Sequence, residues 1–311
     1  MQDSPDLIAR HCPVCGGDRH QPAFRKQALK VVRCHACSML FASPLNAALV
    51  DGRFYHREGI GYYTSADKLE GDFTPVRFQR ELRILQRFCP SGRVLDVGCG
   101  TGAFLHHLRH IHPGRFEVLG TDVSGPALEH ARNAGIPVLT EPFLKYEFPG
   151  DEFDAVTFWA VLEHVEHPAS FLRKAAAALK AGGHCFVLVP NMRSLAARIL
   201  GSRYRYVMPE HINYFTASTL AKMADVLPAF ERVEIRGSHF NPIVLGQDLL
   251  RPRAHVPGTE RAALLKRTNS WKENRRLRLL HAAYELAEAA LSRLGLADNL
   301  VMVLRRREFF H

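Results

Sequence analysis

A glycine-rich segment constrains the fold of this chain most strongly. It runs Arg93-Val-Leu-Asp-Val-Gly-Cys-Gly-Thr-Gly102, an apolar run that closes with glycines at alternate positions. Such a run predicts a buried strand that enters a tight loop, with a helix beginning near Ala103. Because glycine lacks a Cβ, Gly98, Gly100 and Gly102 let a ligand lie against bare backbone, and the helix N-terminus adds unpaired N–H groups. The segment therefore predicts a ligand site at the end of a strand.

The spacing and two neighbouring acids narrow the kind of ligand. The glycines follow a G-x-G-x-G pattern, whereas the dinucleotide fingerprint reads G-x-G-x-x-G and needs a clear approach for pyrophosphate. Asp96 stands just before the loop, where an acid suits a cationic ligand. Asp122 lies 26 residues later at the tip of the next expected strand, where a carboxylate can accept hydrogen bonds from ribose hydroxyls. The alternative for Asp122 is that it only caps the following helix.

Strand-like and helix-like stretches alternate from this segment onward, which is typical of an α/β domain with a parallel sheet. The expected strands cover residues 93–97, 116–121, 136–139, 153–158, 184–189, 230–236 and 299–304. Apolar residues at helical spacing predict a helix over 75–88 before the first strand, and a helix-rich stretch over 240–297 before the last.

Four cysteines near the N-terminus form two C-x2-C knuckles. Cys12-Pro-Val-Cys15 and Cys34-His-Ala-Cys37 are separated by eighteen residues, which is close to the spacing of zinc ribbons. Each knuckle places two thiolates on one turn, and two turns complete a tetrahedral shell for zinc. Four protein ligands leave no open coordination position, so we expect a structural zinc that holds a head too small for its own core.

The charge balance limits the classes of partner, and the cysteine content indicates the cellular compartment. There are 41 Lys and Arg against 31 Asp and Glu, a formal charge of +10 and a pI near 9.5. This balance admits anionic substrates, nucleic acid or an acidic surface as partners. No run approaches the roughly 18 apolar residues of a membrane span, and the polar start lacks the apolar core of a signal peptide. We therefore expect a cytoplasmic protein with reduced thiols.

The chain is expected to contain three units. They are a zinc ribbon, a connector and a main domain with two insertions, at residues 1–45, 46–90 and 91–311, with the insertions at 190–221 and 240–297. The connector contains Gly61-Tyr62-Tyr63, which predicts packing at a junction or, alternatively, a lid that closes over a ligand. Ligands of open α/β sheets bind beyond the carboxyl ends of the strands, so the insertion at 190–221 is assigned to a substrate site.

Ordered motifs run through the main domain: Val94-Leu-Asp-Val-Gly-Cys-Gly-Thr-Gly102, Gly120-Thr-Asp-Val-Ser124, Phe153-Asp-Ala-Val156, Leu162-Glu-His-Val165, Leu179-Lys-Ala-Gly-Gly183, and Pro190-Asn191 followed by Glu210-His-Ile-Asn-Tyr-Phe-Thr216. This set resembles the class I S-adenosylmethionine (SAM)-dependent methyltransferases, in the branch that includes the ubiquinone-biosynthesis O-methyltransferases and zinc-ribbon-headed methyltransferases. The resemblance covers residues 55–240. It implies an α/β fold with a Rossmann-like seven-stranded sheet, completed by an antiparallel last strand after the helical insertion.

The resemblance also implies the residues that hold SAM. The loop and its preceding acid would bind the methionine end, through Asp96, Gly98, Cys99, Gly100 and Gly102. Asp122 would take the ribose, and Val123 would flank the adenine. Phe158 and Trp159 fall where the fourth strand of the family backs the cofactor.

One departure from the family pattern concerns metal. Ubiquinone-type enzymes carry a Glu three residues before the Glu-His pair and are thought to hold a divalent ion with all three. Here that position is Ala160, which leaves Glu163 and His164. Two ligands make a poor magnesium site, so the pattern predicts metal-independent transfer. The chain also lacks an Asn/Asp-Pro-Pro-aromatic motif, which favours an oxygen acceptor first and carbon or nitrogen second.

A hydroxyl acceptor needs a base, and histidine is the commonest choice. His164 is favoured slightly because Glu163 and His164 follow the fourth strand, while His211 and Tyr214 in the insertion are candidates to orient a small-molecule acceptor. Two other classes of function remain open. A basic protein with a zinc ribbon could methylate RNA, or a zinc-ribbon module could carry a SAM-binding fold without activity.

Overall fold

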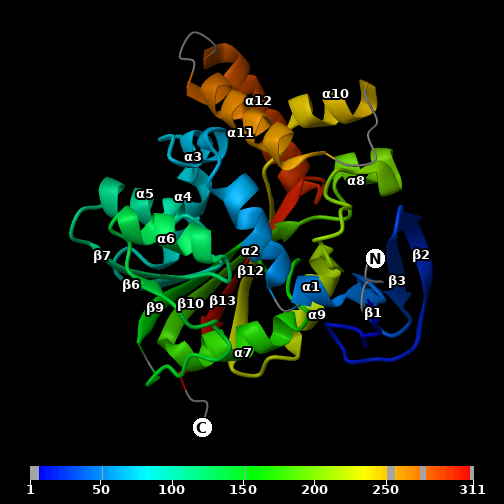
Figure 1. Cartoon of the computed structure of the whole chain (residues 1–311), viewed down its shortest axis with the longest axis horizontal. Helices are drawn as coiled ribbons and strands as arrows, with labels where there is room; N and C mark the ends of the chain where they lie inside the picture. Colours follow the sequence, from blue (N-terminus) through cyan, green and yellow to red (C-terminus); the bar gives the residue numbers. More distant parts are fainter. Residues whose placement is uncertain (1–6, 51, 151, 251–255, 274–277, 309–311) are drawn as a thin grey trace.

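The computed structural model describes residues 7–50, 52–150, 152–250, 256–273 and 278–308. Seven strands form the central sheet: β6 (Gly92–Val97), β7 (Phe116–Thr121), β8 (Val138–Leu139), β9 (Phe153–Trp159), β10 (Leu179–Pro190), β12 (Phe230–Ser238) and β13 (Asn299–Arg306). Their order across the sheet is β12-β13-β10-β9-β6-β7-β8 (Figure 1). The strands from β8 to β10 run parallel, and β13 is antiparallel to both neighbours. This confirms the expected seven-stranded sheet with an antiparallel last strand.

The fifth strand differs from its expected bounds. It was expected over 184–189, but β10 begins at Leu179, which pairs with Phe153, while His184 pairs with Ala155. The register shifts between these pairs, and the intervening residues contain Gly182, whose φ is +76°. The glycines of the Leu179–Gly183 motif therefore form an irregularity within the strand, because a glycine can adopt a left-handed backbone there.

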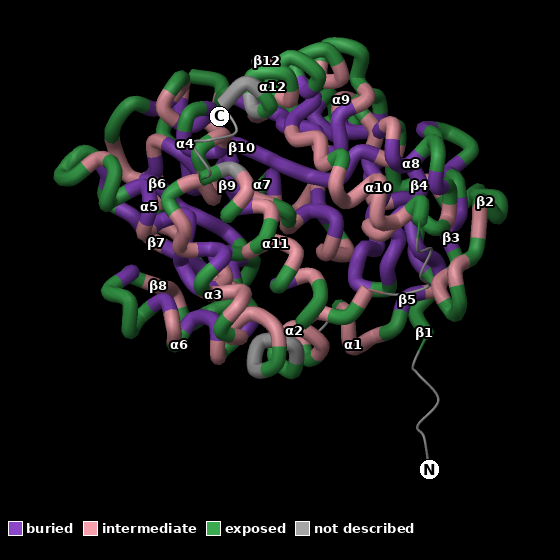
Figure 2. Tube along the Cα trace, turned by 90° about the horizontal axis from the view of Figure 1, so that it is seen from above, coloured by how far each residue is buried: buried purple, intermediate pink, exposed green. Residues whose placement is uncertain are grey.

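Helices cover both faces of the sheet. The helices α4 (Gln79–Phe88), α5 (Ala103–Ile111) and α6 (Gly125–Asn133) share one hydrophobic cluster with it, and α7 (Pro168–Ala178) and α9 (Ala217–Asp225) share the other. Along β13, Leu300, Met302 and Leu304 belong to one cluster and the residues between them to the other. Alternate residues of a strand point to opposite faces, so the sheet is buried on both sides (Figure 2).

The N-terminal head is built onto the main domain. Its sheet contains β2 (His20–Lys26), β3 (Leu29–Cys34) and β4 (Leu40–Ala42), and its fourth strand is β11 (Asn213–Tyr214) from the insertion at 190–221. A short ladder joins β1 (Leu7–Ile8) to β5 (Leu45–Asn46). Met39 and Phe41 are fully buried in the same hydrophobic cluster as Leu220 and Met223 of α9. The head therefore shares its core with the sheet domain beside which it lies (Figure 1).

The connector and the two insertions contain the remaining helices. These are α1 (Ala47–Val50), α2 (Arg53–Glu58), the π-helix η1 (Gly59–Tyr63), α3 (Ala66–Asp72), α8 (Leu195–Leu200), the 3-10 helix η2 (Gly201–Arg203), α10 (Pro242–Leu250), α11 (Gly258–Glu273) and α12 (Arg278–Arg293). The expected helical insertion before the last strand is confirmed, although its residues 251–255 and 274–277 lie outside the described ones. Within the described ranges, no helix is both long enough and apolar enough to span a membrane.

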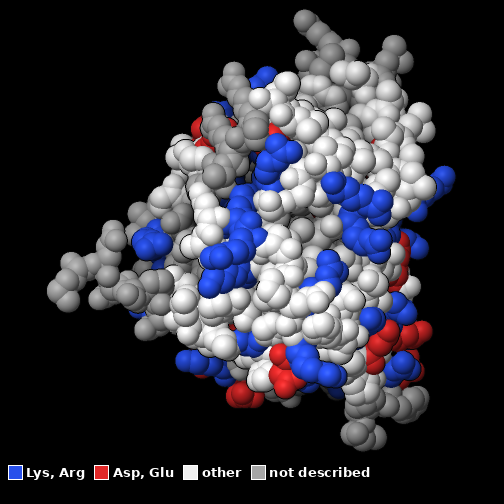
Figure 3. Space-filling view, turned by 90° about the vertical axis from the view of Figure 1, so that its right-hand side faces the viewer, with Lys and Arg blue, Asp and Glu red and all other residues white. Residues whose placement is uncertain are grey.

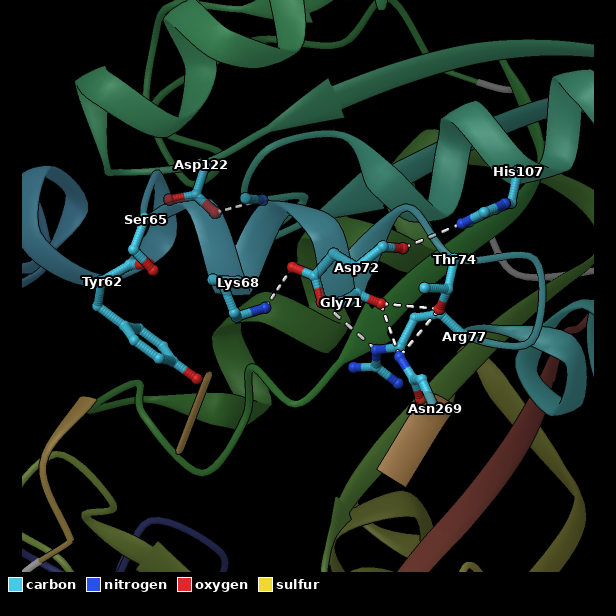
Figure 4. Close-up of polar contacts among 11 residues, drawn as sticks. Tyr62, Ser65, Lys68, Gly71, Asp72, Thr74, Arg77, His107, Asp122 and Asn269 are labelled. Atoms are coloured by element: carbon cyan, nitrogen blue, oxygen red, sulfur yellow. Dashed lines mark hydrogen bonds and ion pairs between the residues drawn. The ribbon is translucent and has the colours of Figure 1, made fainter. Parts of the chain in front are cut away.

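Polar contacts fasten α11 to the connector (Figure 4). Asn269 is buried, and its Nδ2 donates to the carbonyl of Gly71 at 2.7 Å and to Thr74 Oγ1 at 2.9 Å. A Cβ on Gly71 would lie 3.1 Å from the Leu265 side chain, so the two helices approach closely there. Two distant segments of the chain thus pack as one layer above the carboxyl end of the sheet.

Arg10 joins the head to the main domain. Its side chain is buried and donates to three oxygens: the Ile212 carbonyl at 3.2 Å, the Glu166 carbonyl at 2.5 Å and Asn213 Oδ1 at 3.1 Å. Burial lowers the pKa of Arg10 to about 10, which still leaves it charged at neutral pH. A buried cation with three acceptors fixes the turn after β9 against the insertion.

We predict that Arg10→Met weakens this junction. The substitution keeps an apolar stem but leaves three buried oxygens without their donor, which should lower the free energy of unfolding by about 2 kcal/mol or more. Amide hydrogen exchange should also accelerate in residues 161–166. Arg33→Met, an exposed position of the head, is the control and should change stability by less than about 0.5 kcal/mol. Equal effects of the two substitutions would contradict this assignment.

Candidate functional site

The loop between β6 and α5 presents bare backbone. Gly98 has φ +76° and Gly100 has φ +53°, both in the left-handed region. A Cβ on Gly98 would lie 2.5 Å from Val161 Cγ2, whereas one on Gly100 would meet nothing within 4 Å. The N–H groups of Gly98 and Cys99 donate to the Thr121 carbonyl at 2.7 and 3.1 Å. The loop is thus held against β7 on one side and open on the other, and Gly102 begins α5 as its N-cap.

Two carboxyl groups flank this loop, one buried and one partly buried. Asp96 is 2% exposed and accepts a hydrogen bond from Thr157 Oγ1 at 2.6 Å, and burial raises its pKa to about 7. Asp122, labelled in Figure 4, accepts from the N–H of Gly100 and the N–H of Ser124, both at 2.8 Å, and burial raises its pKa as well. Asp122 therefore organises the loop itself, and the paired acids suit a ligand with positive charge and hydroxyl groups.

The other residues expected to hold SAM differ in their surroundings. The Cys99 side chain points toward β7, because a Cβ on Gly120 would lie 2.6 Å from its Sγ. Only the backbone of Cys99 therefore faces the ligand side of the loop. Val123 is 52% exposed directly after β7. Phe158 is fully buried in the core and Trp159 packs edge-on against Phe104, so both support the strand from within.

The connector covers the tips of these strands. A Cβ on Gly52 would lie 3.5 Å from Val123 Cβ, and one on Gly125 would lie 3.2 Å from the His56 ring. Tyr62 packs beneath the Arg261 guanidinium of α11, with 4.9 Å from its ring centroid to Arg261 Cζ. The start of the connector thus lies beside Val123, while Tyr62 of the segment considered as a lid contacts the helical insertion.

Three polar side chains meet beyond the end of β9. Ligand atoms of Glu163, His164 and His211 all lie within 4.8 Å of one another, and the two imidazole centroids are 4.6 Å apart. Among the described residues, both carboxylate oxygens of Glu163 are buried and have no hydrogen-bond partner. Burial raises the pKa of Glu163 to about 8, lowers the pKa of His164 to about 4, and lowers the pKa of His211 well below its usual range. We call these three residues the site triad.

Backbone and amide contacts place the triad. The Glu163 carbonyl accepts from the N–H groups of Ile212 and Asn213, at 2.8 and 3.0 Å. Asn213 Nδ2 donates to the carbonyls of Leu162 and Val165 at 2.8 and 2.7 Å. The turn that carries Glu163 and the loop that carries His211 are therefore held together as one unit.

Further residues around the triad are not among the site residues predicted from the sequence. His164 Nδ1 lies 2.9 Å from the Glu210 carbonyl and 3.0 Å from the Tyr55 hydroxyl. Glu210 Oε1 accepts from Arg261 at 3.0 Å. Local spacing could not identify these three residues, because they come from α2, the insertion and α11. Only the Glu-His motif at Glu210-His211 hints at their shared location.

Tyr214 lies in different surroundings from the triad. Its hydroxyl donates to the Met208 carbonyl at 3.3 Å, and its ring packs edge-on against Phe24 of the head at 6.0 Å. Because Tyr214 is 3% exposed and engaged in this way, its observed contacts are those of a packing residue.

The departure at residue 160 has a structural counterpart. Ala160 is exposed with φ +59°, a conformation that a non-glycine residue rarely adopts. The family's magnesium arrangement therefore does not fit, since a methyl group stands where a carboxylate would be. His211, however, adds a third side chain to the pair counted from the sequence.

The four head cysteines form a second cluster. Their sulfur atoms all lie within 4.8 Å of one another, with Cys12 and Cys37 Sγ 3.3 Å apart and Cys15 and Cys34 Sγ 3.5 Å apart. A tetrahedral zinc with Zn–S bonds of about 2.3 Å requires sulfurs about 3.8 Å apart, so this arrangement fits a four-thiolate shell.

Comparisons with known proteins agree with this geometry. The family model described as "Methyltransferase domain" matches residues 76–226. A ubiquinone biosynthesis O-methyltransferase of Yersinia pestis is 32% identical over 201 residues, which cover 56% of this chain and 78% of that protein. Another from Ralstonia nicotianae is 31% identical over 191 residues, covering 55% and 78%.

A solved structure shows the same fold. The SAM-dependent methyltransferase from Thermotoga maritima superposes with a TM-score of 0.52 at 17% identity, covering 82% of this chain and 98% of that one. The strand order, the glycine loop and the relatives lead to one conclusion. This chain belongs to the class I SAM-dependent methyltransferases.

Proposed function

We propose that the protein transfers a methyl group from SAM to a hydroxyl of a small molecule, such as a sugar or natural-product intermediate. The observation that carries this proposal is the site triad, because it gathers side chains able to activate a hydroxyl beyond the strand that neighbours the glycine loop. The relatives named as ubiquinone biosynthesis O-methyltransferases support an oxygen acceptor.

The proposed SAM site consists of the loop backbone and the two acids. Asp96 would face the positively charged methionine end, and Asp122 would exchange one of its loop contacts for ribose hydroxyls. The open side of Gly100 supports this placement, since a ligand can approach its backbone directly. Val123 would flank the adenine, and Cys99 would contribute backbone only, with its N–H kept on the Thr121 carbonyl.

We predict that Asp122→Ala weakens SAM binding by about 10- to 100-fold, because a hydrogen bond to a charged acceptor contributes about 1.5–3 kcal/mol. Isothermal titration calorimetry with SAM and S-adenosylhomocysteine measures the change. Asp225→Ala, at a half-exposed carboxylate on α9, is the control and should bind as the wild type does. An unchanged dissociation constant for Asp122→Ala would refute the assignment.

We also propose that residues 1–45 form a zinc ribbon through Cys12, Cys15, Cys34 and Cys37. Closed four-thiolate zinc would supply folding energy to the head and perform no chemistry. The buried positions of Cys12, Cys34 and Cys37 support this, because buried thiolates need a compensating positive charge.

Elemental analysis tests the zinc. Cys37→Ser should lower the zinc content by about one per chain, since a four-thiolate shell holds one ion. His35→Ala, an exposed histidine inside the second knuckle, should leave the content unchanged. A head that stays folded and metal-free in the wild type would rule the ribbon out.

Methyl transfer is an in-line displacement in which the sulfonium loses its charge. The protein mainly needs to align the acceptor, exclude water and relieve the acceptor oxygen of its proton. The connector over Val123 supports the exclusion of water. The sequence favours His164 as the base, but its lowered pKa makes the lone imidazole a weak one, so we propose that Glu163, His164 and His211 activate the hydroxyl together.

We predict that His164→Ala and His211→Ala keep the affinity for SAM, and that at least one loses about 100-fold or more in turnover, which is the usual contribution of a group handling the acceptor proton. Turnover is measured as S-adenosylhomocysteine formed from hydroxylated small molecules and sugar nucleotides. Tyr214→Phe is the matched control, because its hydroxyl faces Met208. Wild-type turnover in both histidine variants would instead favour an acceptor that is already a nucleophile, such as an amine or an enolate carbon.

RNA methylation is the second candidate function. Groups of Lys and Arg side chains spread over the face on which the head lies, while Asp and Glu gather toward its lower part (Figure 3). Such a face suits a phosphate backbone. S-adenosylhomocysteine formation with RNA, at a rate that falls steeply with salt, would favour this candidate. No turnover with any acceptor would leave a SAM-binding protein without catalysis.

A further inference from the structure

We infer that Glu163, His164 and His211 bind a divalent transition-metal ion, with His211 taking the place of the glutamate that the chain lacks at residue 160. The inference deepens the proposed function, since the same triad would activate the acceptor hydroxyl. It rests on two independent features of the triad: the orientation of each imidazole, and the Glu163 carboxylate that lacks a partner among the described residues.

The hydrogen bond of His164 fixes which nitrogen faces the triad. Nδ1 lies 2.9 Å from the Glu210 carbonyl. A carbonyl oxygen only accepts, so Nδ1–H donates to it and Nε2 keeps its lone pair. The Tyr55 hydroxyl, 3.0 Å from Nδ1, is also within reach of the same carbonyl at 3.4 Å and donates there in this arrangement. Metal-binding histidines usually donate their other ring N–H to a carbonyl or carboxylate in this way, which sets both the tautomer and the ring direction.

The His211 ring is held by an aromatic neighbour. It stacks on Tyr206 with an interplanar angle of 12° and a centroid distance of 5.9 Å. His211 is 5% exposed, so its ring nitrogens face protein rather than solvent. A neighbouring group therefore fixes the orientation of each imidazole.

The carboxylate of Glu163 lacks a positive partner. Among the described residues, both of its oxygens are fully buried without a hydrogen bond. The nearby cation, Arg261, donates to Glu210 at 3.0 Å, and that pair is neutral overall. A buried carboxylate without a partner is costly, and a bound divalent ion would compensate it.

The ligand set determines the class of ion. Magnesium prefers oxygen ligands, whereas two imidazoles with one carboxylate favour ions such as Zn²⁺, Fe²⁺ and Co²⁺. Three protein ligands leave at least one coordination position for a further group. An ion bound there would lower the pKa of a hydroxyl that reached it. The sequence pattern contains two adjacent ligands and therefore predicts metal-independent transfer. It misses the third ligand, because His211 lies 47 residues after His164 and only the fold brings the two together.

The test uses the full chain with its zinc content determined beforehand. Co²⁺ is titrated by calorimetry and by visible absorption, and Mg²⁺ is titrated in parallel. We expect the wild type to bind Co²⁺ more tightly than Mg²⁺, at about one ion per chain beyond the zinc of the cysteines. His211→Ala and the nearly isosteric Glu163→Gln should each weaken Co²⁺ binding by more than about 100-fold, since even outer contacts contribute about 10- to 100-fold.

Two controls keep the outcome interpretable. His167→Ala removes an exposed histidine of the same loop and should bind Co²⁺ as the wild type does. Retained S-adenosylhomocysteine binding shows that each variant is folded. The inference is overturned if the wild type takes up no Co²⁺. It is also overturned if Co²⁺ binding survives both triad substitutions. Because metal binding is measured without an acceptor, a failure of O-methylation leaves this result unaffected, and the reverse also holds.

Discussion

The side chain of Asn213 is the contact on which the geometry of the site depends. Its backbone pairs with Phe41 in the head, its Nδ2 donates to the carbonyls of Leu162 and Val165, and its Oδ1 accepts from Arg10. The residue is 2% exposed, so loss of the amide would leave the buried carbonyls of Leu162 and Val165 without this donor and would remove one of the three acceptors of Arg10. One amide thereby joins the head, the insertion and the turn after β9. These contacts fix the relative positions of the three triad side chains.

This coupling gives the head a role beyond its own fold. A four-cysteine module of this size cannot bury an adequate core, and here it shares the main hydrophobic cluster through Met39 and Phe41. The pairing of β11 with β4 also covers one edge of the head sheet, an edge that would otherwise expose unpaired backbone groups. Loss of the head fold would therefore remove Arg10 and β4 from the site together, even though none of the cysteines lies near the glycine loop in sequence.

The sequence predicts what depends on local pattern and misses what depends on long-range contact. The strand Phe116–Thr121 has the expected bounds because an apolar run ends at an acid and a helix cap, and the knuckle cysteines meet because each pair sits on one turn. By contrast, Arg10 reaches Asn213 across more than two hundred residues, and His211 meets His164 only after the insertion folds back. Periodicity reports which face of an element is buried, and it contains no information on which loops meet.

The two buried acids of the site face different electrostatic problems. Asp96 keeps one donor, Thr157, and its pKa is raised to about 7, so ionisation of the empty site costs free energy at neutral pH. An acid whose pKa is raised on folding makes the protein less stable as the pH rises from about 4 toward that value, since the unfolded chain ionises first. A cationic ligand beside Asp96 reverses this penalty, which links cofactor binding to stability. Both carboxylate oxygens of Glu163 lack a donor among the described residues, so its ionisation depends more strongly on a positive partner. A small methyl acceptor cannot supply that charge. A cation bound by Glu163 together with two neutral imidazoles can supply it.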